Sequence, residues 1–127
     1  MAKGSETQPV VGVDLGGTNI TAGLVDARDK VVAREKTDTR ADEGPDAVVD
    51  RIADCVKAVE VAAVGLGVPG AVERDTGRVV EAVNLRWRDL PVAEMLEARL
   101  KLPIVVDNDV NVGTWGEYRA GAGRGSA

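Results

Sequence analysis

The residue types that could take part in chemistry gather in three short segments, and residues 14–19 (DLGGTN) come first. Two adjacent glycines, Gly16 and Gly17, free the backbone for positive φ and for close approach of a ligand. Successive N–H groups in such a turn can form a concave site for an anion. Thr18 and Asn19 add side-chain donors, and the Asp14 carboxylate could hold Mg²⁺ through water. The alternative is a hairpin turn with glycines for geometry only, since the segment matches neither GxxxxGKS/T nor GxGxxG.

The second and third segments place glycines or polar residues beside apolar runs. Residues 65–70 (GLGVPG) either allow a ligand to approach a strand end closely or form a simple Pro-Gly turn. Residues 107–111 (DNDVN) crowd carboxylates and amides where a strand should meet a helix. Ligands of α/β sheets bind at carboxyl ends of strands, and a carboxylate there could accept a proton from a substrate hydroxyl. Helix capping by Asp or Asn is the alternative for this segment.

The composition excludes several other kinds of chemistry. The 127 residues contain no histidine and one cysteine, Cys55, so they can form neither an internal disulfide nor a Cys/His zinc site. Catalysis by a Ser-His-Asp or Cys-His arrangement within these residues is excluded for the same reason. The formal net charge of −5 argues against a nucleic-acid partner. Without a membrane-length apolar run, and without a signal segment in residues 1–9, the sequence predicts a cytoplasmic chain with no membrane partner.

The apolar pattern of the first half predicts a meander followed by a helix and a strand. Three strands joined by short turns, expected over Val10–Leu15, Ile20–Asp26 and Lys30–Thr37, predict an antiparallel meander. Apolar residues at helical spacing predict a helix over about residues 45–60, with Cys55 in its core. The apolar run Val61–Val68 is typical of a buried parallel strand.

The second half predicts a hairpin, a helix and a further strand. Ala71–Glu73 and Arg78–Glu81 predict a small hairpin, and a looser stretch over Asn84–Asp89 follows, in which Trp87 is expected to serve packing. Asp89 is expected to cap a helix that begins near Pro91 and stops before Pro103. Ile104–Asp107 predicts a short strand, and a final helix should begin near Asn108 or Asp109. The order βββ, then α-β-α-β-α, predicts an α/β fold with a mixed sheet.

The chain divides into three parts by composition. Residues 1–9 are polar and are expected to be flexible. Residues 10–120 have the length of one domain, and the glycine-rich residues 121–127 (GAGRGSA) have the composition of a linker.

Taken together, the three segments resemble the ROK family, which contains sugar kinases and sugar-responsive repressors. VGVDLGGTNI (residues 11–20) is similar to the family's first phosphate motif, GLGVPGAVE (65–73) to its sugar-side loop, and DNDVNVGTWGE (107–117) to its catalytic segment. GAGRG (121–125) is similar to the stretch that leads into a second domain. The resemblance covers nearly all of residues 10–127 and implies an actin/hexokinase-like ATPase (ribonuclease H-like) domain.

The resemblance also implies a role for each matching residue. Asp109 would be the general base that takes the proton of the sugar hydroxyl, and Asn108 would hydrogen-bond the sugar. The backbone of Gly70 would line the sugar cleft. Asp14 would help to place Mg²⁺, while the phosphates would be contacted by Gly16, Gly17, Thr18 and Asn19. Asn84 would contact the sugar; it lies in VNLRW, where the family more often has PNLxGW, so that Val83 stands in place of the proline.

The function implied is transfer of a phosphoryl group from ATP or polyphosphate to a hexose, with glucose as the first candidate. The family's further sugar-binding residues, its zinc cluster and its other nucleotide-binding segments would lie in a second domain, so the resemblance implies that this chain is an N-terminal part with little activity alone. The full protein would be a homo-oligomer. Within the family, a repressor would need a winged helix before Val10, where nine residues stand. A domain that binds sugar without catalysis is the other alternative.

Overall fold

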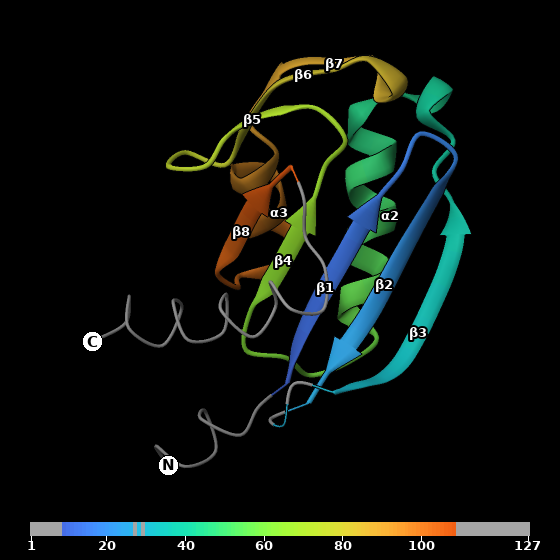
Figure 1. Cartoon of the computed structure of the whole chain (residues 1–127), viewed down its shortest axis with the longest axis vertical. Coiled ribbons are helices and arrows are strands. Elements are labelled where there is room, and N and C mark those ends of the chain that lie inside the picture. Colours follow the sequence, from blue (N-terminus) through green and yellow to red (C-terminus); the bar gives the residue numbers. More distant parts are fainter. Residues whose placement is uncertain (1–8, 27, 29, 109–127) are drawn as a thin grey trace.

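The computed structural model describes residues 9–26, 28 and 30–108. These residues form two sheets, two α-helices and two short 3₁₀ turns (Figure 1). The elements in chain order are β1 (Val10–Leu15), β2 (Asn19–Val25), β3 (Val31–Asp38), η1 (Ala41–Glu43), α2 (Pro45–Lys57), β4 (Val64–Gly67), β5 (Ala71–Glu73), β6 (Arg78–Ala82), η2 (Val83–Leu85), β7 (Trp87–Leu90), α3 (Val92–Leu100) and β8 (Ile104–Asp107).

The larger sheet is mixed, with strand order β3-β2-β1-β4-β8. β1, β2 and β3 pair antiparallel, so the predicted meander is confirmed, while β1, β4 and β8 pair parallel. Because β3 and β1 both run opposite to β2, the strands β1, β3, β4 and β8 all end at the same edge of the sheet, which is uppermost in Figure 1. This edge is called the carboxyl edge below.

One face of the larger sheet carries the apolar core. Val13, Leu66 and Val106 lie side by side in the register of β1, β4 and β8 and are fully buried. They belong to one cluster with the inner residues of α2 and α3, and both helices lie behind the sheet in Figure 1. Each buried aliphatic side chain contributes about 1.5–3 kcal/mol relative to an exposed one. The core therefore fixes the strands whose ends form the carboxyl edge.

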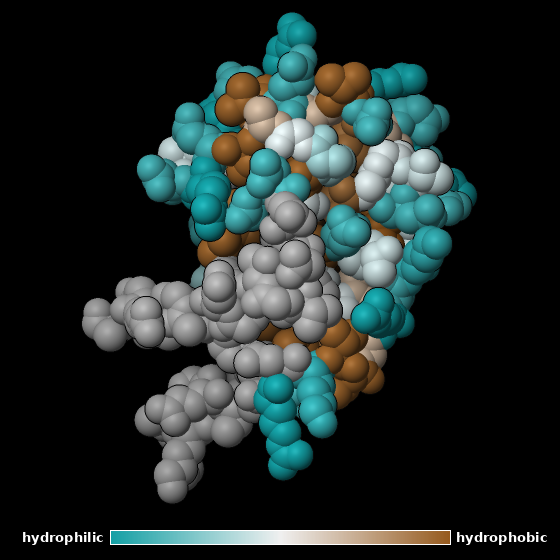
Figure 2. Space-filling view, in the orientation of Figure 1, coloured by the Kyte–Doolittle hydropathy of each residue, from teal (hydrophilic) through white to brown (hydrophobic). Residues whose placement is uncertain are grey.

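The smaller sheet lies above the carboxyl edge and has the order β5-β6-β7, all antiparallel. The predicted looser stretch over Asn84–Asp89 is wrong, because η2 and β7 occupy it and β7 pairs with β6. Trp87 begins β7 and is only 2% exposed, which confirms its packing role. Two apolar residues in this region are exposed, Val80 of β6 and Val83 of η2, and Figure 2 shows hydrophobic patches among hydrophilic residues over the upper part of the molecule.

The helix α3 begins without the predicted cap. Asp89 lies in β7 with a φ of 52°, and its carboxylate pairs with the Arg78 guanidinium at 2.6 Å instead. The N–H of Ala93 in the first turn of α3 donates to the Gly77 carbonyl at 3.1 Å, so the hairpin turn satisfies this helix end. The helix ends at Leu100, ahead of Pro103, as expected.

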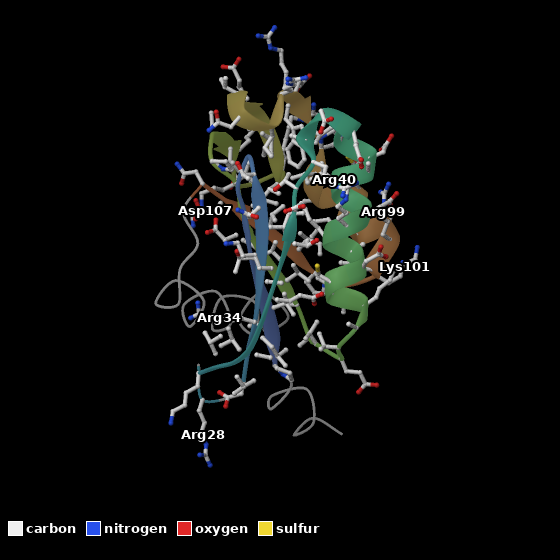
Figure 3. All side chains as sticks on the ribbon, turned by 90° about the vertical axis from the view of Figure 1, so that its right-hand side faces the viewer. Arg28, Arg34, Arg40, Arg99, Lys101 and Asp107 are labelled. Atoms are coloured by element: carbon white, nitrogen blue, oxygen red, sulfur yellow. The ribbon has the colours of Figure 1, made fainter. Side chains whose placement is uncertain are left out.

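The two helices are joined by Arg99, which Figure 3 shows beside α2. Its Nε donates to Asp50 Oδ1 of α2 at 2.6 Å, and its Nη1 donates to the Met95 carbonyl at 3.0 Å.

Among the described residues, no helix is both long and apolar enough to cross a membrane.

Element boundaries differ from the expected ones by a few residues. The helix expected over residues 45–60 ends at Lys57, and the strand expected over Val61–Val68 is restricted to Val64–Gly67. Residues before β4 instead contact the chain next to β1, since the Ala62 N–H donates to the Pro9 carbonyl at 2.8 Å. The final helix expected near Asn108 falls almost wholly outside the described residues.

Candidate active site

The carboxyl edge brings the ends of three parallel strands together. In the sheet register Asp14 of β1 lies beside Gly67 of β4, and Gly67 lies beside Asp107 of β8. All three therefore share the face opposite the helices. Asp14 is exposed, and its carboxylate has no hydrogen bond or ion pair to another described residue. It is a free hard oxygen donor at a strand end, which suits Mg²⁺ bound directly or through water.

The turn from β1 to β2 holds its carbonyl groups inward. The Gly16 carbonyl accepts the Thr39 hydroxyl at 2.7 Å, and the Thr18 carbonyl accepts the Thr39 N–H at 2.9 Å. The Gly16 N–H donates to the Asn19 carbonyl at 2.8 Å. The N–H groups of Gly17 and Thr18 have no acceptor among residues 9–26, 28 and 30–108. Two N–H groups without an acceptor in one partly exposed turn can bind an anion such as phosphate.

Gly17 is needed for close packing. The expectation that residues 16 and 17 use positive φ is wrong, because within the described residues positive φ at glycine occurs at Gly44 and Gly77. A Cβ on Gly17 would instead stand 2.9 Å from Asn84 Cβ and 3.2 Å from the Asn84 carbonyl oxygen. The structure thus brings the predicted phosphate turn against residues 83–87 (VNLRW), which contain the predicted sugar contact Asn84, although Gly17 and Asn84 are 67 positions apart by numbering (84 − 17).

Gly70 is explained by packing as well. A Cβ there would stand 2.9 Å from Ala82 Cα and would also overlap the Glu81 carbonyl, so β6 lies directly against this backbone. The Gly70 N–H donates to the Val68 carbonyl at 2.9 Å, which closes the turn between β4 and β5. Close packing against β6 therefore explains why position 70 is a glycine, and the contact of its backbone with sugar stays a prediction.

The end of β8 is held by a residue that sequence reasoning did not single out. The Asp107 carboxylate lies 3.2 Å from Arg74 Nη2 and accepts the Asn108 N–H at 2.7 Å. Arg74 comes from the β5–β6 hairpin, and nothing in the local sequence distinguishes it from other exposed arginines. Figure 3 shows Asp107 in the same upper half of the molecule as Arg40, which follows β3 at this edge. Asn108 is exposed, and Asp109 lies outside the described residues.

The strand order and the position of the turn define the class of protein. A mixed sheet built from an antiparallel meander and parallel β-α-β units, with a glycine turn after the first strand, is an actin/hexokinase-like ATPase domain. The chain belongs to the ROK family, whose sequence model matches residues 10–127.

Individual relatives and solved structures agree with this assignment. A glucokinase from Streptomyces coelicolor is 44% identical over 119 residues, which cover 91% of this chain and 37% of the relative. The ROK family glucokinase from Streptomyces griseus, solved with glucose and AMPPNP, superposes with a TM-score of 0.74 at 39% identity over 91% of this chain and 38% of that one. An inorganic polyphosphate/ATP-glucomannokinase from Arthrobacter gives a TM-score of 0.70 at 31% identity over 80% of this chain and 44% of that one.

This chain therefore spans little more than a third of the length of the curated glucokinase. Proteins named as xylose repressors are also among its relatives, so membership of the family does not by itself establish catalysis.

Proposed function

We propose that this chain is the N-terminal part of a hexose kinase that transfers the γ-phosphoryl group of ATP to a hydroxyl of glucose. The observation that carries the proposal is the turn after β1, in which the N–H groups of Gly17 and Thr18 have no acceptor among the described residues and Asp14 lies free beside them. The similarity to glucokinases, one of them solved with glucose and the ATP analogue AMPPNP, supports the choice of substrates.

The proposed phosphate side consists of the turn and Asp14. Gly16, Gly17, Thr18 and Asn19 would bind the phosphates, mainly through backbone N–H groups. Mg²⁺, when bound near Asp14, would neutralise charge on the phosphate oxygens. Asp14 fits this role because its carboxylate is exposed and without a partner among the described residues.

The proposed sugar side lies opposite, on η2 and the end of β8. Asn84 and Asn108 would hydrogen-bond the sugar, and the backbone of Gly70 would line the cleft. Asp109 would accept the proton of the attacking hydroxyl as the oxygen bonds to the γ-phosphorus and ADP leaves. Contact between Gly17 and Asn84 supports a short distance between the two sides.

The remaining features of the proposal concern the whole protein. Residues 10–120 would form the first domain, residues 121–127 would lead into a second, and the complete protein would be a cytoplasmic homo-oligomer. The chain of residues 1–127 alone would have little or no kinase activity, because the sugar-binding and nucleotide-binding segments that the family resemblance assigns to a second domain would be missing.

The test is transfer of labelled phosphate from [γ-³²P]ATP to a panel of hexoses by the complete protein, with polyphosphate as a second donor. Glucose 6-phosphate formation from ATP is the expected result, with no turnover by residues 1–127 alone. Binding of glucose without transfer to any hexose would instead identify a sugar-sensing domain, the alternative that the xylose repressors among the relatives favour.

A further inference from the structure

One residue with no assigned role joins the phosphate turn to the core. Among the described residues, Thr39 is the only polar or charged one that is buried, with no exposed surface. It follows β3 at the carboxyl edge, directly beside the turn formed by residues 16–19. A buried hydroxyl is tolerated only when it is hydrogen-bonded, so the hydrogen-bond partners of Thr39 indicate what this residue does.

Thr39 uses each of its polar groups on a different partner. Its hydroxyl donates to the Gly16 carbonyl at 2.7 Å, and its N–H donates to the Thr18 carbonyl at 2.9 Å. Its own carbonyl accepts Nη1 of Arg51 at 2.7 Å. Thr39 therefore stands between the phosphate turn and the helix α2, to which Arg51 belongs.

The geometry of the peptide bond turns these contacts into an orientation of N–H groups. The carbonyl of Gly16 and the N–H of Gly17 belong to one planar trans peptide, so they point in opposite directions. When the Thr39 hydroxyl holds the Gly16 carbonyl inward, the Gly17 N–H must point outward. That N–H has no acceptor among the described residues. The hydroxyl of Thr39 thus sets the direction of a donor that it does not touch.

Arg51 fixes Thr39 in turn. Its guanidinium also forms an ion pair with the Glu43 carboxylate of η1, so both partners hold the segment between β3 and α2 in place. The side chain of Arg51 is three-quarters buried, which limits competition by water for the Thr39 carbonyl. The helix itself is anchored by Val48 and Ile52 in the core.

We propose that Thr39 is a positioning residue for phosphoryl transfer, which aims the Gly17 N–H at the phosphates of the donor through the Gly16 carbonyl. The proposal rests on the proposed function, since it assumes that the turn binds the phosphates of ATP. Thr39 acts without contact to substrate, and its role is separate from that of the sugar side.

The test compares Thr39→Val, which removes the hydroxyl at nearly constant volume, with Thr39→Ser, which keeps it, in the complete protein. Thr37→Val is the matched control, because Thr37 lies two residues away on β3 and its side chain makes no hydrogen bond to another described residue. Loss of one orienting hydrogen bond should raise the KM and the calorimetric Kd for ATP about five- to tenfold in Thr39→Val, with the KM for glucose unchanged. Thr39→Ser and Thr37→Val should stay within about twofold of the wild type, a margin smaller than one hydrogen bond.

The outcomes separate this inference from the proposed function. An active wild type in which Thr39→Val keeps its Kd for ATP, or loses affinity for ATP and glucose equally, overturns the positioning role. A wild type that binds ATP but transfers no phosphate overturns the proposed kinase activity. A weaker Kd for ATP in Thr39→Val would then still support the orientation of the Gly17 N–H toward the phosphates, but no role of Thr39 in phosphoryl transfer. If Thr39→Val does not fold, Arg51→Met takes its place, since it removes both the hydrogen bond to the Thr39 carbonyl and the ion pair with Glu43. The Kd for ATP should then rise about threefold with the Kd for glucose unchanged, and an unchanged Kd for ATP overturns the proposal.

Discussion

The contact between Gly17 and Asn84 can be tested through stability alone. In Gly17→Ala the new Cβ would stand 2.9 Å from Asn84 Cβ and 3.2 Å from the Asn84 carbonyl oxygen, both closer than ordinary van der Waals contact. The backbone φ of Gly17 lies outside the left-handed region, so alanine adds a clash without adding strain to the backbone. Forcing an extra methyl group into packed structure costs about 1–3 kcal/mol of unfolding free energy.

The assay is urea unfolding of a double-mutant cycle built from Gly17→Ala and Asn84→Gly. Asn84→Gly removes the nearer of the two clashing groups, so the double variant should lose less stability than the sum of the single variants, by about 1 kcal/mol. Gly16→Ala is the control, because its Cβ would meet the Asn19 carbonyl at 3.1 Å and nothing of Asn84. Its cost should add to that of Asn84→Gly within about 0.5 kcal/mol.

Additivity of Gly17→Ala and Asn84→Gly would refute this reasoning. The phosphate turn and Asn84 would then not be in contact in solution, and the two sides of the site would not lie as close together as proposed.

Two further predictions concern the helices. Arg99→Met should lower the unfolding free energy by about 0.5–1 kcal/mol at low salt, since Arg99 and Asp50 form a partly exposed ion pair. This loss of stability should become smaller in 1 M salt, which screens the charges. A loss of the same size at both salt concentrations would show that packing of the side chain, rather than its charge, is responsible. Burial, together with the Glu35 and Asp54 carboxylates, raises the pKa of the Cys55 thiol above its ordinary value, so less thiolate is present at a given pH. Alkylation of Cys55 by iodoacetamide at pH 8 should therefore be slower than that of a free cysteine, and its rate should continue to increase with pH after the rate for a free cysteine has levelled off. Equal rates at pH 8 would contradict the structure.

The parts of the fold that follow from local pattern were predictable. Val10–Leu15 is apolar apart from Gly12 and the exposed Asp14 and forms β1 over those residues, and the helical spacing of Val48, Ile52 and Val56 identifies α2. Both signals come from residues that face the core, where burial dictates the residue type. The mixed sheet then follows from the order of the elements.

The parts that depend on distant contacts were not predictable from local pattern. β7 exists because Trp87–Leu90 pairs with β6, and nothing in its own residues marks that pairing. Asp89 has the residue type of a helix cap, yet it pairs with Arg78 because β7 extends to Leu90. The same limit applies in the site: Thr39 is one of two threonines near the end of β3, and only its burial and its contacts with a turn 23 positions earlier set it apart from Thr37.

The central claim is that this chain supplies one side of a kinase site, with Asp109 as the base. The most direct test is Asp109→Asn in the complete protein, measured as glucose binding by calorimetry and as phosphoryl transfer from ATP. Removal of a general base lowers turnover about 10²–10⁴-fold, whereas asparagine preserves the size and much of the hydrogen bonding of the side chain. The account predicts a nearly unchanged Kd for glucose together with this loss of turnover. Turnover within about tenfold of the wild type, less than the loss of a general base causes, would contradict it.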